Sequence, residues 1–226
     1  LFICTIGSTL LFIPFLNTPS VQAQSPVSGY DITEQCFAVA DETLVGTNGK
    51  NSLDALVRLN RTNGQTTVIG MTGTQKIEAI AFGPMDTLYA VDANRLGTLD
   101  VNTGVFAAKP QLLGSGSGTQ GVVSFSDADG LFYDVANNIL WGVQRVSSKP
   151  DVLFQIDPVT GARVANAFGA GQDYVEVQPP KAGSSTLNDL DDIAIDPVDD
   201  VMYGAANSGG TGGILVMIDR LTGATT

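Results

Sequence analysis

The 226-residue sequence contains no histidine and only two cysteines. Without histidine, the chain cannot build a Ser-His-Asp triad, a Cys-His pair or a His-ligated zinc or haem site from its own residues. Basic side chains are also scarce, because 11 Lys and Arg stand against 23 Asp and Glu, for a net charge of −12. A chain this acidic repels a phosphate backbone, so we expect no nucleic-acid partner.

The first 30 residues carry no charged side chain and begin with an apolar run from Leu1 to Leu16. Gly7 and Pro14 interrupt the run, which is too short for a stable membrane span. Residues 21–23 (Val-Gln-Ala) have the compact side chains of a signal-peptidase site. We therefore predict an N-terminally clipped signal peptide over residues 1–23 and a secreted, periplasmic or cell-surface protein. The alternative is an uncleaved anchor.

The two cysteines divide between the predicted leader and the mature chain. Cys4 lies in the leader, so cleavage would leave Cys36 without a partner and the mature chain without an internal disulfide. No basic residue adjoins Cys36 to lower the pKa of its thiol. We therefore expect Cys36 to be a small core residue rather than a nucleophile.

One phrase recurs four times along the chain, over residues 56–64, 96–104, 153–161 and 215–223. It consists of an aliphatic residue, two variable residues, a second aliphatic residue, Asp or Asn, two variable residues, Thr or Asn, and Gly. The Asp or Asn side chain can accept a hydrogen bond from the backbone two residues on, and Gly adopts the positive φ that closes a turn. The phrase therefore predicts a strand that runs into a tight turn.

A second phrase precedes three of these copies, over residues 80–91, 132–143 and 193–204, with a shorter copy at 37–46. Each copy reads as strand, polar turn and strand, with Tyr89, Trp141, Tyr203 or Val45 in the second strand. A short fourth strand follows the Gly turn. Residues 114–118 and 169–186 make the later repeats longer, and we predict that they are insertions between repeats.

Repeats of four antiparallel strands at this spacing are typical of β-propeller blades. We predict an all-β protein in which a linker over residues 24–34 precedes about four propeller blades over residues 35–226, with the ring continuing beyond the C-terminus. A tandem β-sandwich is the competing interpretation, but its strands would not repeat as four with the same two turns.

Three of the repeated phrases, over residues 67–70, 88–91 and 99–104, resemble the repeats of secreted bacterial β-propellers of the YVTN, NHL and quinoprotein-like group. The resemblance covers residues 35–226 and implies the propeller fold. That group includes surface binding proteins, lactonases and quinone dehydrogenases, so the resemblance implies no single activity.

Alignment of the repeats places Glu78, Asp129 and Asp191 at equivalent positions just before the first strand, with Glu34 or Gln35 near that position in the first copy. In propellers this strand lines the central channel, so we expect a ring of carboxylates at one rim. Such oxygen ligands suit Ca²⁺. Asp189, in the acidic segment beside the long insertion, is a further candidate ligand. The alternative is that these acids cap turns or face solvent.

We therefore expect a secreted propeller that binds a protein or a glycan through its loop face, without catalysis. The alternative, which the resemblance implies, is a metal-dependent hydrolase or lactonase of the gluconolactonase type. Those enzymes hold their metal through Glu, Asn and Asp, so the lack of histidine does not exclude one. The sequence indicates no catalytic residue and no cofactor other than Ca²⁺.

Overall fold

The structure is a computed structural model that describes residues 2–3, 36–40, 53–179, 189–207 and 213–226. Nearly all its regular structure is β-strand, and one 3₁₀ turn at Pro84–Asp86 accompanies the strands. Within the described ranges, no helix has the length and apolarity needed to cross a membrane. The predicted all-β class is confirmed.

Besides one two-stranded hairpin, the described residues form four sheets that follow one another along the chain, and in each of them consecutive strands pair antiparallel. The first contains β1 (Phe2–Ile3), β2 (Cys36–Ala40), β3 (Ala55–Leu59) and β4 (Thr66–Met71). The second contains β5 (Ile77–Phe82), β6 (Leu88–Asp92), β7 (Arg95–Leu99) and β8 (Phe106–Ala108). The third contains β11 (Ala128–Asp134), β12 (Ile139–Gln144), β13 (Val152–Ile156) and β14 (Tyr174–Glu176). The fourth contains β15 (Leu190–Ile195), β16 (Met202–Asn207) and β17 (Gly213–Ile218).

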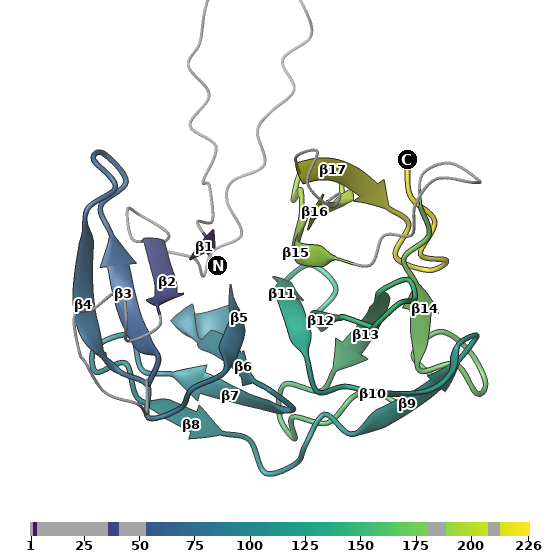
Figure 1. The fold of residues 1–226 in the computed structure, drawn as a ribbon, viewed down its shortest axis with the longest axis horizontal. Helices are drawn as coiled ribbons and strands as arrows, with labels where there is room; N and C mark the ends of the chain where they lie inside the picture. Colours follow the sequence, from purple (N-terminus) through teal and green to yellow (C-terminus); the bar gives the residue numbers. More distant parts are fainter. Residues whose placement is uncertain (1, 4–35, 41–52, 180–188, 208–212) are drawn as a thin grey trace, which may run out of the picture.

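The four sheets are arranged as propeller blades around a common centre (Figure 1). The first strand of each later blade lies innermost, and β11 contacts β5 on one side and β15 on the other. A hairpin of β9 (Ser115–Gly118) and β10 (Gly121–Ser124) joins the second blade to the third. In the fourth blade, a bridge between Ile218 and Thr225 marks the start of a fourth strand. The predicted propeller blades are therefore confirmed.

The predicted turn chemistry closes the third strand of each blade. The Asp100 carboxylate accepts a hydrogen bond from the backbone N–H of Asn102 at 2.8 Å, and Asp157 and Asp219 make the same bond two residues on. The glycines that end the four turns have positive φ, at 71° for Gly64, 80° for Gly104, 86° for Gly161 and 74° for Gly223. Glycine adopts this region without a Cβ clash, so local interactions alone reverse the chain here.

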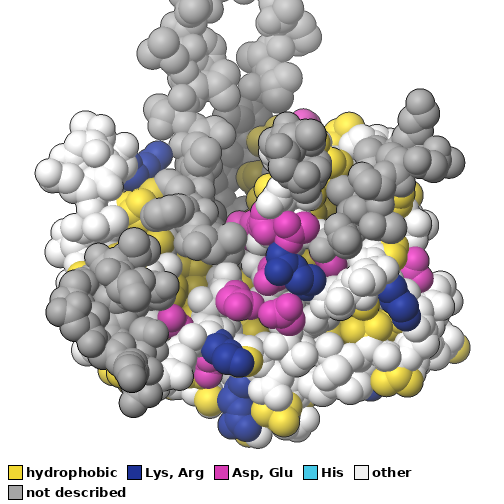
Figure 2. All heavy atoms as spheres, viewed as in Figure 1, with side chains coloured by type: hydrophobic (Ala, Val, Ile, Leu, Met, Phe, Trp, Pro, Cys, Tyr) yellow, Lys and Arg dark blue, Asp and Glu magenta, His cyan; other side chains and the backbone are white. Residues whose placement is uncertain are grey.

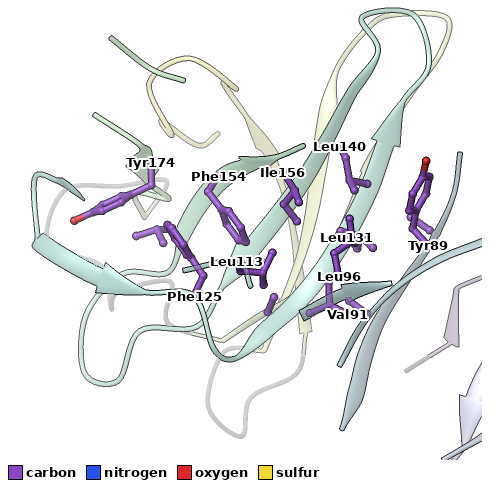
Figure 3. Packing of buried hydrophobic residues seen from close by; sticks show 14 of the residues in the cluster. Tyr89, Val91, Leu96, Leu113, Phe125, Leu131, Leu140, Phe154, Ile156 and Tyr174 are labelled. Carbon is purple, nitrogen blue, oxygen red and sulfur yellow. The ribbon is translucent and has the colours of Figure 1, made fainter. Parts of the chain in front are cut away.

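The core consists of layers between neighbouring blades. Between the second and third blades, the rings of Phe125 and Phe154 stack with centroids 4.1 Å apart, and Leu113, Leu131 and Leu140 belong to the same cluster (Figure 3). A second layer, which contains Trp141, joins the third blade to the fourth. Both faces of the third blade are thus covered.

The first blade departs from the predicted register. The segment from Phe37 was expected to be the first strand, but β2 pairs with β3 as β6 pairs with β7, so it is the second strand. Phe37, not Val45, therefore takes the position of Tyr89, and β1 supplies the first strand. First and second strands of a blade share the same alternation of apolar and polar residues. The alignment of the sequence repeats therefore assigned this segment to the strand before its true position. Glu34 and Val45 lie outside the described residues.

Cys36 is disulfide-bonded, so the expectation that its thiol has no partner is wrong for this chain. That expectation assumed removal of the leader, whereas β2 pairs with Phe2 and Ile3 in the structure. The other cysteine, Cys4, and the predicted boundaries after residues 23 and 34 lie outside the described residues. The signal peptide and the linker stay predictions.

The long insertion of the third repeat falls on both sides of the fourth strand along the sequence. We expected residues 169–186 to follow that strand, but it is β14, so residues 162–173 precede it and only the part from residue 177 follows it. The Asp173 carboxylate accepts hydrogen bonds from the backbone N–H groups of Ser117 and Asn166, both at 2.7 Å. These bonds hold the insertion against the β9–β10 hairpin, which the sequence pattern did not reveal.

Candidate metal centre

The first strands of the second, third and fourth blades each contain a β-bulge near their beginning. The extra residue of the bulge is Glu78 in β5, Asp129 in β11 and Asp191 in β15. A bulge disrupts the ladder locally and redirects a side chain. The structure therefore places these three acids at equivalent positions, at the ends of the inner strands.

Two of the three acids meet, together with a third carboxylate that precedes β11. Oxygen atoms of Glu78, Asp127 and Asp129 all lie within 4.8 Å of one another. Calcium binds oxygen at 2.3–2.6 Å, so two ligands of one ion lie at most about 5.2 Å apart. The donor set and its spacing therefore fit a hard divalent cation. Asp127 was not among the predicted ligands, although its i, i+2 relation to Asp129 was visible in the sequence.

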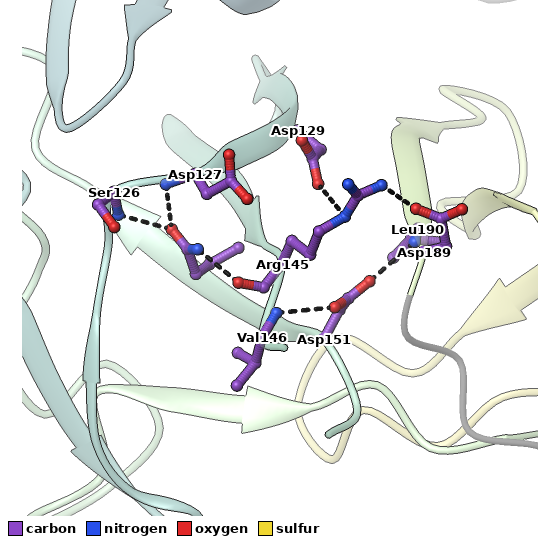
Figure 4. Close-up of polar contacts among 9 residues, drawn as sticks. Ser126, Asp127, Asp129, Arg145, Val146, Asp151, Asp189 and Leu190 are labelled. Carbon is purple, nitrogen blue, oxygen red and sulfur yellow. Dashed lines mark hydrogen bonds and ion pairs between the residues drawn. The ribbon is translucent and has the colours of Figure 1, made fainter. Parts of the chain in front are cut away.

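Arg145, which follows β12, links this cluster to the fourth blade (Figure 4). Its Nε lies 3.2 Å from Oδ2 of Asp129, and its guanidinium also forms an ion pair with Asp189. The contact with Asp129 lacks hydrogen-bond alignment, so the buried Oδ2 accepts no hydrogen bond from any described residue. Asp189 therefore joins the site through Arg145 rather than as a member of the clustered carboxylates.

Buried polar side chains hold the rim in place. The Gln144 amide oxygen accepts the backbone N–H groups of Ser126 and Asp127, at 2.8 and 2.9 Å, and its Nε2 donates to the Arg145 carbonyl. Asp151 is fully buried, and its two oxygens accept hydrogen bonds from the N–H groups of Val146 and Leu190. Both groups are thus satisfied by the backbone, and they position the acids rather than serve as ligands.

The crowded carboxylates favour protonation in the absence of a cation. The pKa of Asp129 is raised to about 7, mainly by burial; the charges of Asp127, Glu78 and Asp151 contribute to the rise, and the charge of Arg145 opposes it. Burial and the neighbouring Asp127 also raise the pKa of Glu78. Figure 2 shows acidic side chains gathered near the centre of the viewed face around few basic ones. A bound cation would offset this repulsion.

Asp191 lies outside the group of three clustered carboxylates. Its charge acts instead on Asp151 and on Asp192, and burial raises the pKa of Asp192 to about 7. The predicted ring is thus divided, because the second and third blades bring their acids together while the acid of the fourth blade stands apart.

No family model and no curated protein sequence matches the chain. Among solved structures, it is similar to a protein of unknown function from Bacteroides caccae, with TM-score 0.43, 6% identity, and coverage of 84% of this chain and 56% of that one. It is similar to a candidate gluconolactonase, with TM-score 0.42, 16% identity, and coverage of 76% and 51%. It is similar to a glucose dehydrogenase, with TM-score 0.47, 11% identity, and coverage of 82% and 78%.

These likenesses are too distant to carry an argument about activity. The chain spans about half the length of the Bacteroides protein and of the candidate gluconolactonase.

Proposed function

We propose that this chain is part of a β-propeller that binds Ca²⁺ at the mouth of its central channel and uses the ion to bind a hydroxyl-rich ligand, namely a glycan. The observation that supports this proposal is the convergence of the Glu78, Asp127 and Asp129 carboxylates from two neighbouring blades. Because they come from different blades, a cation bound by all three would also stabilise the contact between those blades.

The chemistry of the ligands favours calcium. All three groups are hard oxygen donors, and the chain has no histidine to contribute nitrogen. Calcium accepts six to eight oxygen ligands in flexible geometry, whereas magnesium requires a near-ideal octahedron. Three carboxylates leave coordination positions for water or for ligand hydroxyls. Glycan hydroxyls are oxygen donors of this kind.

Thermal unfolding in the presence of Ca²⁺ tests the cation site. An ion that binds only the native state stabilises it by mass action, by about 2.7 kcal/mol at 100 times the Kd. We expect millimolar Ca²⁺ to raise Tm, and Asp129→Asn to remove most of that rise. Asp199→Asn is the matched control, because Asp199 is exposed in the β15–β16 turn. No rise with Ca²⁺, or equal loss in both variants, would contradict the proposal.

A metal-dependent lactone hydrolase is the second candidate. The observation that favours it is the same cluster of three carboxylates, because a divalent cation that they hold with open coordination positions would polarise a lactone carbonyl bound there. Hydrolysis of sugar lactones, measured with and without a chelator, tests this candidate. Turnover that the chelator and Asp129→Asn both abolish would support it, whereas turnover that neither changes would exclude it.

A further inference from the structure

A pocket of about 340 Å³ adjoins the candidate metal centre. It lies where the β9–β10 hairpin approaches the end of β12, and it shares Asp127 and Arg145 with the metal centre. The remaining lining residues are Val122, Val123, Ser124, Ser126, Gln144, Val146, Ser147 and Lys149. The pocket thus shares two residues with the candidate metal centre and also includes Lys149 and Val122.

Three serine hydroxyls line the pocket and are available to a ligand. Ser124, Ser126 and Ser147 are all exposed, and their side chains form no hydrogen bond with any other described residue. Val122, from β10, is 76% exposed and adds an apolar surface at the same place. The pocket therefore combines hydroxyl groups with an apolar wall, which suits the two kinds of surface on a sugar ring.

Two basic side chains line the pocket, and one of them lacks a counter-charge. Lys149 forms no ion pair with any carboxylate in the described part of the chain, and its ammonium makes only a long hydrogen bond of 3.4 Å to the Gln120 carbonyl. Arg145 is shared between Asp129 and Asp189. An unpaired lysine beside free hydroxyls can form a charge-assisted hydrogen bond with an anionic group of a ligand.

The floor of the pocket is held in place before any ligand arrives. Gln144 is 2% exposed and binds the backbone of Ser126 and Asp127. The Lys149 backbone N–H donates to the Val146 carbonyl at 3.1 Å, which closes the turn that carries the lysine. A preorganised site loses less entropy when its ligand binds.

We propose that this pocket binds the carboxylate of an acidic glycan, one that contains uronic acid, while the neighbouring cation binds glycan hydroxyls. The proposal rests on the proposed function, since it requires the cation. A uronic acid presents a carboxylate, hydroxyls and an apolar ring face within one unit, and these match Lys149, the three serines and Val122. A neutral sugar would leave Lys149 unpaired.

The charges around the pocket predict that Ca²⁺ and the acidic glycan bind cooperatively. The acids at the rim repel an anion, and the whole chain carries −12. A divalent cation at Glu78, Asp127 and Asp129 would offset two of their three negative charges and so reduce the repulsion of a ligand carboxylate that approaches Lys149. We therefore expect acidic glycan to bind with Ca²⁺ and to bind at least tenfold more weakly in EDTA.

Calorimetric titration with digalacturonate tests this inference, with a neutral disaccharide and an acidic dipeptide as comparison ligands and a titration into protein-free Ca²⁺ buffer as the blank. We expect Lys149→Gln to weaken digalacturonate binding about tenfold, and to leave the rise in Tm with Ca²⁺ unchanged. Arg61→Gln, which removes one exposed charge from the first blade, should change neither measurement.

The outcomes separate this inference from the proposed function. If Ca²⁺ does not change Tm, the protein lacks the proposed cation site, and the inference fails together with the proposed function. A protein that Ca²⁺ stabilises but that binds no digalacturonate keeps the cation site and overturns the inference alone. Equal affinity of wild type and Lys149→Gln, or equal affinity for the acidic dipeptide, would also overturn it.

Discussion

Leu153 and Leu215 provide a matched test of the packing between blades, because they occupy the same register position in successive blades. Leu153 of β13 pairs with Val143, and Leu215 of β17 pairs with Ala205, the equivalent residue of β16. Leu153 is fully buried in the layer between the third and fourth blades, whereas Leu215 is 71% exposed. The same substitution should therefore have very different effects.

We expect Leu153→Ala to lower the free energy of unfolding by about 3 kcal/mol, within the usual 2–5 kcal/mol for a buried leucine. Leu215→Ala removes a side chain that stays mostly in water, so its loss should be about 0.5 kcal/mol. For a chain of this size, 1 kcal/mol corresponds to about 2–4 °C in Tm. The two variants should therefore differ by roughly 5–10 °C.

Urea denaturation followed by tryptophan fluorescence provides the assay. The single tryptophan, Trp141, is 2% exposed and lies in the same packing layer as Leu153, so it reports on the contact under test. If Leu215→Ala lowered the free energy of unfolding by more than about 2 kcal/mol, Leu215 would be buried in solution rather than exposed on β17. A loss below about 1 kcal/mol from Leu153→Ala would show that the third and fourth blades do not pack as described.

Two further predictions concern buried carboxylates. Arg220→Met should lower the free energy of unfolding, measured by urea denaturation, by about 3 kcal/mol, because it leaves the Asp134 carboxylate buried without its ion-pair partner. The Arg220 guanidinium lies 2.8 Å from this carboxylate, whose side chain is 3% exposed. The double variant with Asp134→Asn should recover part of that loss. Burial alone would raise the pKa of Asp173, but hydrogen bonds from Asn166 and Ser117 and the charge of Arg163 lower it below the ordinary 3.8. The stability that the Asp173 carboxylate contributes is therefore present above pH 3.8 and is lost as the pH falls through the lowered value, so Asp173→Asn should weaken the pH dependence of the urea midpoint in that range.

Local signals in the sequence were sufficient to predict the strands and turns of the blades. An Asp side chain that accepts the N–H two residues on, followed by Gly at positive φ, reverses the chain through interactions among neighbouring residues, so the turn at Asp157 to Gly161 could be predicted without knowledge of the fold. The equivalence of Glu78, Asp129 and Asp191 followed from the same repetition, since equal phrases place equal residues at equal positions of a blade.

Distances across blades were decided by the tertiary structure alone. Repetition predicts that Glu78, Asp129 and Asp191 are equivalent, but not that Asp127 joins the first two while Asp191 stands apart. Arg145 likewise meets Asp189 through a separation of 44 residues that no sequence period indicates. The pairing of Phe2–Ile3 with β2 also depended on contacts remote in sequence. Turns and strands arise from neighbours along the chain, whereas the site depends on how one blade packs against the next.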